Sequence, residues 1–199
     1  MSIDANSVMQ LRTQTGAGVM DCKKALSETG GNVDEAVAFL RKKGLAAAEK
    51  KAGRATKEGL VGSYVHANGK IGVLVEVACE TDFVARTDEF QALVKDIAMH
   101  VAASSPVAVT REEIPENIAA AERELMGAQV AEMGKPEAVR DKIVEGKMEK
   151  WYGEKVLLEQ AFVKDPDMKV ADLVTAAVAK LGENIQIRRI ARFALGEES

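Results

Sequence analysis

The chain has 199 residues, of which 47% are hydrophobic and 29% charged, and its formal net charge at pH 7 is −4. These fractions are typical of a soluble globular protein, and the length gives room for one ordinary domain plus a small one. The acidic total argues against general affinity for nucleic acid, and no apolar stretch reaches the roughly 18 residues that a membrane span needs.

Residues 1–45 are predicted to form a bundle of three short helices. Asn32, followed three residues later by Glu35, is a capping box that starts the third helix, and Gly44 is expected to stop it. So small a bundle buries little apolar surface, and the surface left over often serves a partner. Glycines separate the successive helices, at positions 16 and 18 and at positions 30 and 31.

Residues 46–57 are expected to form a linker with a basic face, either helical or extended. Lys50, Lys51 and Arg54 are among its positive charges, against few acidic ones. A solvated face is the favoured interpretation, because the segment has no aromatic side chain on which bases could stack. An RNA-binding interpretation stays open and predicts that RNA affinity falls steeply with salt.

Residues 58–199 are predicted to form an α+β core. Alternating apolar residues predict a strand over 71–79, and Asn68-Gly69 predicts a two-residue turn that joins it to a strand over 60–66. A closing strand over 184–195 would complete a small antiparallel sheet packed with helices. A helix is expected from about 82 or 88 to 103, and a short extended piece over 106–109. Further helices are expected over 116–133, 136–151, 153–163 and 170–181.

The segment from Glu80 to Arg86 stands between a predicted strand and a predicted helix. Thr81 or Thr87 could cap the helix, because threonine side chains accept hydrogen bonds from the first free backbone N–H groups. Phe83 is seven residues before Phe90, and this spacing alone favours packing of Phe83 in the core. The other interpretation is that a phenylalanine beside a carboxylate at such a junction is presented to a partner.

Two segments carry a resemblance to a known family. Glu76–Arg86 resembles the second signature of the translation elongation factor Ts family, and Leu11–Leu26 resembles the first. The resemblance extends over nearly the whole chain, with Ala78 where the family usually has asparagine and Ala161 where it commonly has proline. The family also begins with a ubiquitin-associated-type helical bundle, which agrees with the bundle predicted for residues 1–45.

The resemblance implies a guanine-nucleotide exchange factor that binds the GDP form of elongation factor Tu. It also implies two sets of partner-binding residues. The set implied to disturb the magnesium site of the GTPase is Asp82, Phe83, Val84 and Ala85, and the set implied to contact the GTPase domain is Arg12, Val19, Met20 and Lys23. From the residues alone, Val19 and Met20 could equally pack inside the bundle. Some short members of the family work as homodimers, so a homodimer with residues 58–199 as its dimerisation domain is a further hypothesis.

No catalytic site, metal site or cofactor site stands out in the sequence. His66 and His100 have no evident partner, no phosphate-binding loop of the Gly-x-x-x-x-Gly-Lys type occurs, and no Cys/His cluster has metal spacing. We therefore expect a binding protein rather than an enzyme, without a cofactor and without direct contact to nucleic acid or membrane. A rival hypothesis is a ubiquitin-associated-like adaptor, in which the bundle binds a protein or peptide and the α+β part is structural.

The expected location is the cytoplasm. Cys22 and Cys79 both lie in apolar patterns, which predicts free buried thiols in a reducing compartment. The first residues lack the basic region and apolar run of a secretory signal.

Overall fold

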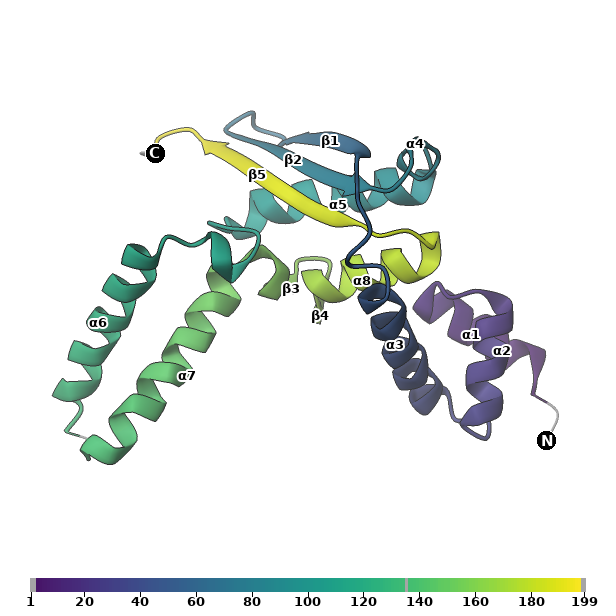
Figure 1. The fold of residues 1–199 in the computed structure, drawn as a ribbon, viewed down its shortest axis with the longest axis horizontal. Coiled ribbons are helices and arrows are strands. Elements are labelled where there is room, and N and C mark those ends of the chain that lie inside the picture. The colour runs from purple at the N-terminus through teal and green to yellow at the C-terminus, as the bar shows by residue number, and fades with distance from the viewer. Residues whose placement is uncertain (1–2, 135, 198–199) are drawn as a thin grey trace. The chain divides into compact units, whose positions relative to one another are not determined.

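The computed structural model describes residues 3–134 and 136–197, and it has the mixed α+β architecture that the sequence predicts (Figure 1). The helices are α1 Ala5–Thr15, α2 Val19–Glu28, α3 Val33–Glu49, α4 Asp82–Ala85, α5 Asp88–Ser104, α6 Glu116–Glu132, α7 Glu137–Lys155 and α8 Val170–Leu181. The strands are β1 Glu58–Val65, β2 Ile71–Cys79, β3 Ala161–Phe162, β4 Asp165–Lys169 and β5 Gln186–Ala194. An antiparallel sheet has the order β1-β2-β5, and β3 pairs with β4 in a second, smaller sheet. None of the helices in the described ranges has the length and apolarity to cross a bilayer.

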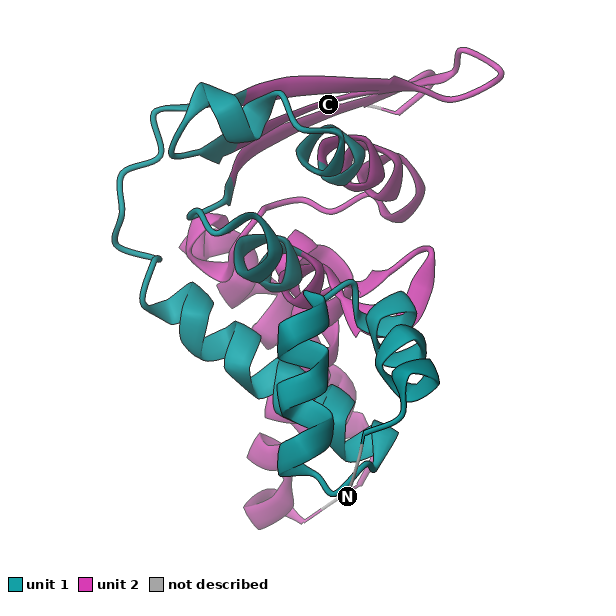
Figure 2. Cartoon of the chain, turned by 90° about the vertical axis from the view of Figure 1, so that its right-hand side faces the viewer, with its two compact units in different colours: residues 1–59, 78–93, 174–186 teal, residues 60–77, 94–173, 187–199 magenta. Residues whose placement is uncertain are grey.

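The chain divides into two compact units, each assembled from three segments of the sequence (Figure 2). The first unit contains Met1–Gly59, Ala78–Leu93 and Val174–Gln186, and the second unit contains Leu60–Val77, Val94–Leu173 and Ile187–Ser199. The first unit therefore holds α1 to α3, the junction between β2 and α5, and most of α8. The second unit holds most of the three-stranded sheet, most of α5 and the hairpin of α6 and α7.

In the first unit, α1, α2 and α3 pack around a closed apolar core. The predicted capping box is confirmed: Asn32 Oδ1 accepts hydrogen bonds from the N–H groups of Asp34 and Glu35, at 3.0 and 3.2 Å. The Asn32 amide donates in return to the Glu35 carboxylate at 3.0 Å. The buried members of this core are Val8, Leu11, Cys22, Ala25, Leu26 and Ala36.

The third helix does not stop at Gly44, so that prediction is wrong. α3 continues to Glu49, because the alanines after Gly44 are the strongest helix formers. A Cβ built on Gly44 would lie 3.7 Å from the Cβ of Ala179. This is an ordinary van der Waals distance, so α3 and α8 pack side by side at Gly44 within the first unit.

In the second unit, one face of β2 is buried and the other is open. Val73, Val75 and Val77 are buried as the alternation predicts, whereas Leu74 is exposed. The predicted two-residue turn at Asn68-Gly69 is wrong. Residues 66–70 form a longer loop in which Gly69 has a φ of 67° but Asn68 has no positive φ. The Asn68 side chain instead accepts a hydrogen bond from the N–H of Lys70 at 3.1 Å and closes the loop.

The helix predicted over 153–163 is also not formed. α7 runs on to Lys155, and the chain then pairs with the extended piece before η1, the 3-10 turn Arg111–Glu113. Leu157 N–H donates to Ala108 O at 2.9 Å, and Val107 N–H donates to Lys155 O at 2.9 Å. This pairing confirms the predicted extended piece over 106–109. It also ends α7, because the backbone of Leu157 finds its partner in another segment.

Candidate partner-binding site

At the junction between β2 and α5, the short helix α4 and the long helix α5 are capped separately and do not form one continuous helix. Thr81 precedes α4, and its Oγ1 accepts a hydrogen bond from Val84 N–H at 3.4 Å. Thr87 precedes α5, and its Oγ1 accepts from Phe90 N–H at 3.2 Å and donates to Val84 O at 2.8 Å. Both threonines therefore act as the helix caps that the sequence predicts.

The break between α4 and α5 leaves Phe83 in solvent. Phe83 is 79% exposed, whereas Phe90 is 0% exposed. The interpretation that Phe83 packs in the core is therefore wrong, because the seven-residue spacing places two residues on one face only if a single helix contains both. A bare aromatic ring is presented on the surface of the first unit.

The neighbours of Phe83 hold the turn beneath the ring. Asp82 pairs with Arg86, with 2.9 Å between its carboxylate and the guanidinium. Val84 is half-buried, and Ala85 is buried with its N–H bonded to Thr81 O at 3.3 Å. The four residues that the resemblance implies for the magnesium site of the GTPase thus form one helical turn, in which Phe83 protrudes and Ala85 faces inward.

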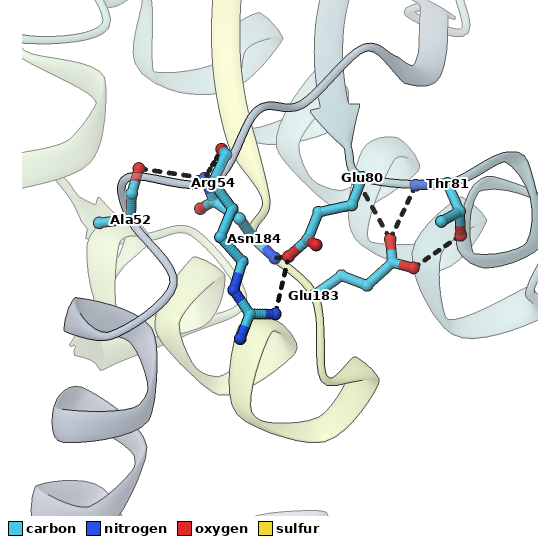
Figure 3. A network of polar contacts seen from close by, with 6 residues as sticks. All are labelled: Ala52, Arg54, Glu80, Thr81, Glu183 and Asn184. Carbon is cyan, nitrogen blue, oxygen red and sulfur yellow. Dashed lines mark hydrogen bonds and ion pairs between the residues drawn. The ribbon is translucent and has the colours of Figure 1, made fainter.

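One carboxylate binds the backbone just before this turn (Figure 3). Glu183, in the connection between α8 and β5, accepts hydrogen bonds through Oε2 from the N–H groups of Glu80 and Thr81, at 3.1 and 3.0 Å. Its Oε1 accepts a hydrogen bond from the Thr81 hydroxyl at 2.6 Å. Three donors thus converge on a single side chain, which holds the N-terminal side of α4.

The next residue extends the network to the segment after α3 (Figure 3). Asn184 N–H donates to the Glu80 carboxylate at 2.6 Å, and Arg54 lies 3.4 Å from the same oxygen. The Asn184 side-chain amide donates to Ala52 O at 3.2 Å and to Arg54 O at 2.8 Å. The connection between α8 and β5 therefore touches both the Phe83 turn and the predicted linker. Sequence reasoning missed both residues, because no local pattern marks a contact across so many positions.

The second set of predicted contact residues lies on the surface of the bundle. Met20 is 76% exposed and Val19 is 43% exposed, and both belong to the first turn of α2. Arg12 on α1 and Lys23 on α2 are exposed as well. The alternative that Val19 and Met20 pack inside the bundle is therefore wrong. The two predicted sets stay on separate elements, α4 for one and α1 with α2 for the other.

The cysteines have no exposed thiol. Cys22 and Cys79 are both free and buried, as the sequence predicts. Burial raises the pKa of the Cys79 thiol, and the nearby Glu183 carboxylate raises it further. In the part of the chain that the structure describes, no three His, Cys, Asp or Glu side chains are grouped so that they could hold a metal ion.

Comparison with known proteins places the chain in one family. Residues 3–197 match the family described as Elongation factor TS. Elongation factor Ts of Geobacter sulfurreducens is 60% identical over 197 residues, which cover 99% of this chain and 91% of that protein. Elongation factor Ts of Anaeromyxobacter dehalogenans strain 2CP-1 is 62% identical over 195 residues, which cover 98% of this chain and 89% of that protein.

Proposed function

The chain belongs to the elongation factor Ts family, and from this premise we propose that it is the guanine-nucleotide exchange factor of elongation factor Tu. It binds the GDP form of that GTPase in the cytoplasm and promotes GDP release during translation elongation. The observation that carries the proposal is the exposure of Phe83 on a turn whose backbone is held in place. Aromatic side chains are enriched in protein interfaces, and a fixed one can enter a partner with little loss of its own freedom.

The exchange activity follows from linkage between two ligands of one GTPase. If the factor and GDP each bind the GTPase more weakly when the other is bound, the weakening is the same in both directions. The exposed residues Arg12, Val19, Met20 and Lys23 supply binding energy at the bundle. That energy is used to hold the GTPase in a state from which GDP leaves more readily.

Phe83 is the residue assigned to the nucleotide site. Its ring enters the GTPase and displaces groups that support the bound magnesium ion, while Asp82, Val84 and Ala85 shape and anchor the turn. A GDP that has lost its Mg²⁺ carries poorly neutralised phosphate charge and dissociates faster. No covalent bond forms or breaks in such an exchange, so the role requires neither a catalytic residue nor a cofactor.

The test is the release of a fluorescent GDP analogue from elongation factor Tu, followed by stopped-flow fluorescence. Addition of the wild-type chain is expected to accelerate release, and Phe83→Ala is expected to remove most of that acceleration. Leu125→Ala is the matched control, because Leu125 is also a large exposed apolar residue but lies on α6. A wild-type chain that leaves the release rate unchanged would refute the proposal. The adaptor hypothesis, in contrast, predicts that Phe83→Ala has no effect on any binding.

We also propose that two copies of the chain associate through the open face of the three-stranded sheet. Val75 is buried on the face toward α5, so Leu74 points to the opposite face, where Glu76 pairs with Arg189 of β5 at 2.5 Å. Phe193 is four residues after Arg189 on β5 and therefore lies on the same open face. Its exposed apolar side chains are Val61, Val65, Leu74 and Phe193.

Sedimentation equilibrium tests the dimer. At micromolar concentration the wild type is expected to have the mass of two chains, and Leu74→Glu the mass of one, because a charge on the open face would be buried without a partner when two copies associate. A wild-type mass equal to one chain would refute the dimer and leave the exchange proposal untouched.

A further inference from the structure

We propose that Glu183 is a positioning residue for nucleotide exchange, which fixes the turn that presents Phe83 to the GTPase. The inference rests on the proposed function of Phe83 and adds to it a residue from a distant part of the chain. The hydrogen bonds of Glu183 go to Glu80 and Thr81. It acts through Thr81 and the backbone before α4.

The first argument is the number and type of hydrogen bonds on the Glu183 carboxylate (Figure 3). Two come from consecutive backbone N–H groups, of Glu80 and Thr81, and one comes from the Thr81 hydroxyl. Hydrogen bonds to an ionised acceptor are stronger than neutral ones. Two consecutive peptide groups bound to one carboxylate have little freedom to rotate, so the backbone direction into α4 is set.

The second argument concerns the hydroxyl of Thr81. A hydroxyl has one proton to donate and lone pairs that accept. Because Thr81 donates its proton to Glu183 Oε1 at 2.6 Å, a lone pair stays available to accept the N–H of Val84 at 3.4 Å. Glu183 thus holds the rotatable hydroxyl in the orientation that caps the turn.

The third argument is the shortness of α4. It has four residues, Asp82–Ala85, and so short a helix gains almost nothing from helical cooperativity. Its conformation depends on its caps and on contacts from outside. Asn184 supplies a second outside contact, since its N–H donates to the Glu80 carboxylate at 2.6 Å. The connection between α8 and β5 therefore binds Glu80 at both its backbone and its side chain.

The expected effect of Glu183→Ala is on the maximal rate of stimulated GDP release. Loss of the carboxylate leaves the surface residues of α1 and α2 in place, so the factor concentration at half-maximal stimulation changes little. The maximal rate falls by roughly tenfold, because Phe83 must then be ordered during each encounter. Glu183→Gln is expected to recover most of the rate. Its amide oxygen accepts from the two N–H groups, and its NH₂ group donates to Thr81 Oγ1.

The deciding experiment is a double-mutant cycle of Glu183→Ala and Phe83→Ala, read as stimulated release of the fluorescent GDP analogue from elongation factor Tu. If Glu183 acts through the ring, Glu183→Ala causes no further loss in the Phe83→Ala background. Glu113→Ala is the matched control, because the Glu113 carboxylate also accepts a backbone hydrogen bond, from Val109 N–H at 2.9 Å. It is expected to lower thermal stability without slowing release. Thr81→Val removes only the hydroxyl from the same network. It takes the place of Glu183→Ala in the double-mutant cycle if Glu183→Ala does not fold.

The outcomes separate this inference from the proposed function. Equal losses from Glu183→Ala with and without Phe83 would overturn the positioning role, since the effect would then be general. A normal rate for Glu183→Ala together with a slow Phe83→Ala would overturn the positioning role alone. A wild-type chain without any stimulation would overturn the proposed function itself.

Discussion

Gly62 of β1 and Val94 of α5 are in such close contact that a Cβ built on Gly62 would overlap Cγ1 of Val94. The same Cβ would lie 3.4 Å from Cγ2 of Val75 on the neighbouring strand. The hydrogen side chain of Gly62 therefore sets how closely α5 packs on the sheet. Gly62→Ala is expected to reduce the free energy of unfolding by roughly 1–3 kcal/mol, because the added methyl overpacks the core.

Urea unfolding followed by circular dichroism measures this cost. Gly72→Ala on β2 is the matched control, since nothing lies within 4 Å of a Cβ built there. The control is expected to change the free energy of unfolding by roughly 0.5 kcal/mol or less. Equal effects of the two substitutions would show that the contact of Gly62 with Val94 does not determine how well the added methyl group is tolerated.

Phe83→Ala is expected to leave stability almost unchanged, although the same substitution at Phe90 is severe. Phe83 is 79% exposed, so its truncation removes few contacts, and the expected change is roughly 0.5 kcal/mol or less. Phe90 is fully buried, and Phe90→Ala is expected to cost about 3–5 kcal/mol. Thermal unfolding of the two variants side by side makes the comparison. A large loss of stability in Phe83→Ala would show that Phe83 packs in the core.

His100 is expected to make the protein less stable in mild acid. The imidazole is fully buried between Gln160 Oε1, at 2.9 Å from Nε2, and Val163 N–H, which donates to Nδ1 at 3.1 Å. Burial lowers the pKa of His100 below its ordinary 6.5, against a smaller opposite effect of the Gln160 hydrogen bond. The unfolded chain therefore takes up the proton first. The contribution of neutral His100 to the free energy of unfolding is therefore fully present above pH 6.5. It is lost progressively as the pH falls from there toward the lowered pKa of the folded state.

The measurement is the unfolding temperature of the wild type and of His100→Gln between about pH 7.5 and 5.5. His100→Gln is expected to be less stable at neutral pH but to lose less stability in acid. His66→Gln serves as the control for an exposed histidine and is expected to follow the wild type. If the unfolding temperatures of the wild type and of His100→Gln changed in parallel with pH, His100 would not be the cause of the loss of stability in acid.

Replacement of Arg111 by lysine is expected to destabilise the protein. Its guanidinium binds the Glu149 carboxylate through two nitrogens at 2.7 Å, binds Glu159, and lies 4.3 Å above the centre of the Tyr152 ring. These hydrogen bonds raise the pKa of Arg111 and lower that of Glu149. A lysine ammonium can neither bridge two carboxylates with a planar fork nor stack on the ring.

Thermal unfolding at low and high salt tests this site. Arg111→Lys is expected to lower the unfolding temperature more than Arg123→Lys, because Arg123 pairs only with Glu145 among the ion pairs of the described residues. The difference should shrink as salt screens the charges. Equal shifts for the two variants would mean that the second carboxylate and the ring add nothing.

The parts of the fold that could be predicted are those decided by neighbouring residues. The apolar period of 170–181 predicts α8 at its observed bounds, and Asn32 with Glu35 predicts the start of α3. The predictions fail where a distant residue decides. The helix predicted over 153–163 does not form, because the backbone of Leu157 pairs with that of Ala108.

The candidate site divides in the same way. The caps Thr81 and Thr87 could be predicted, because each bonds to a residue three positions further along. The exposure of Phe83 could not be derived from periodicity, since it depends on the break between the two capped helices. Glu183 carries no local signal at all. Only the fold brings it to Thr81.

Thr81 and Glu183 are 102 positions apart, and this separation has a consequence for synthesis of the protein. Translation proceeds from the N-terminus, so the segment with Phe83 leaves the ribosome long before the carboxylate that holds it has been made. A nascent or truncated chain that ends before α8 contains the complete motif but not its support. If Glu183 positions Phe83 for exchange as proposed, a chain becomes competent to exchange nucleotide only after α8 and Glu183 have been synthesised.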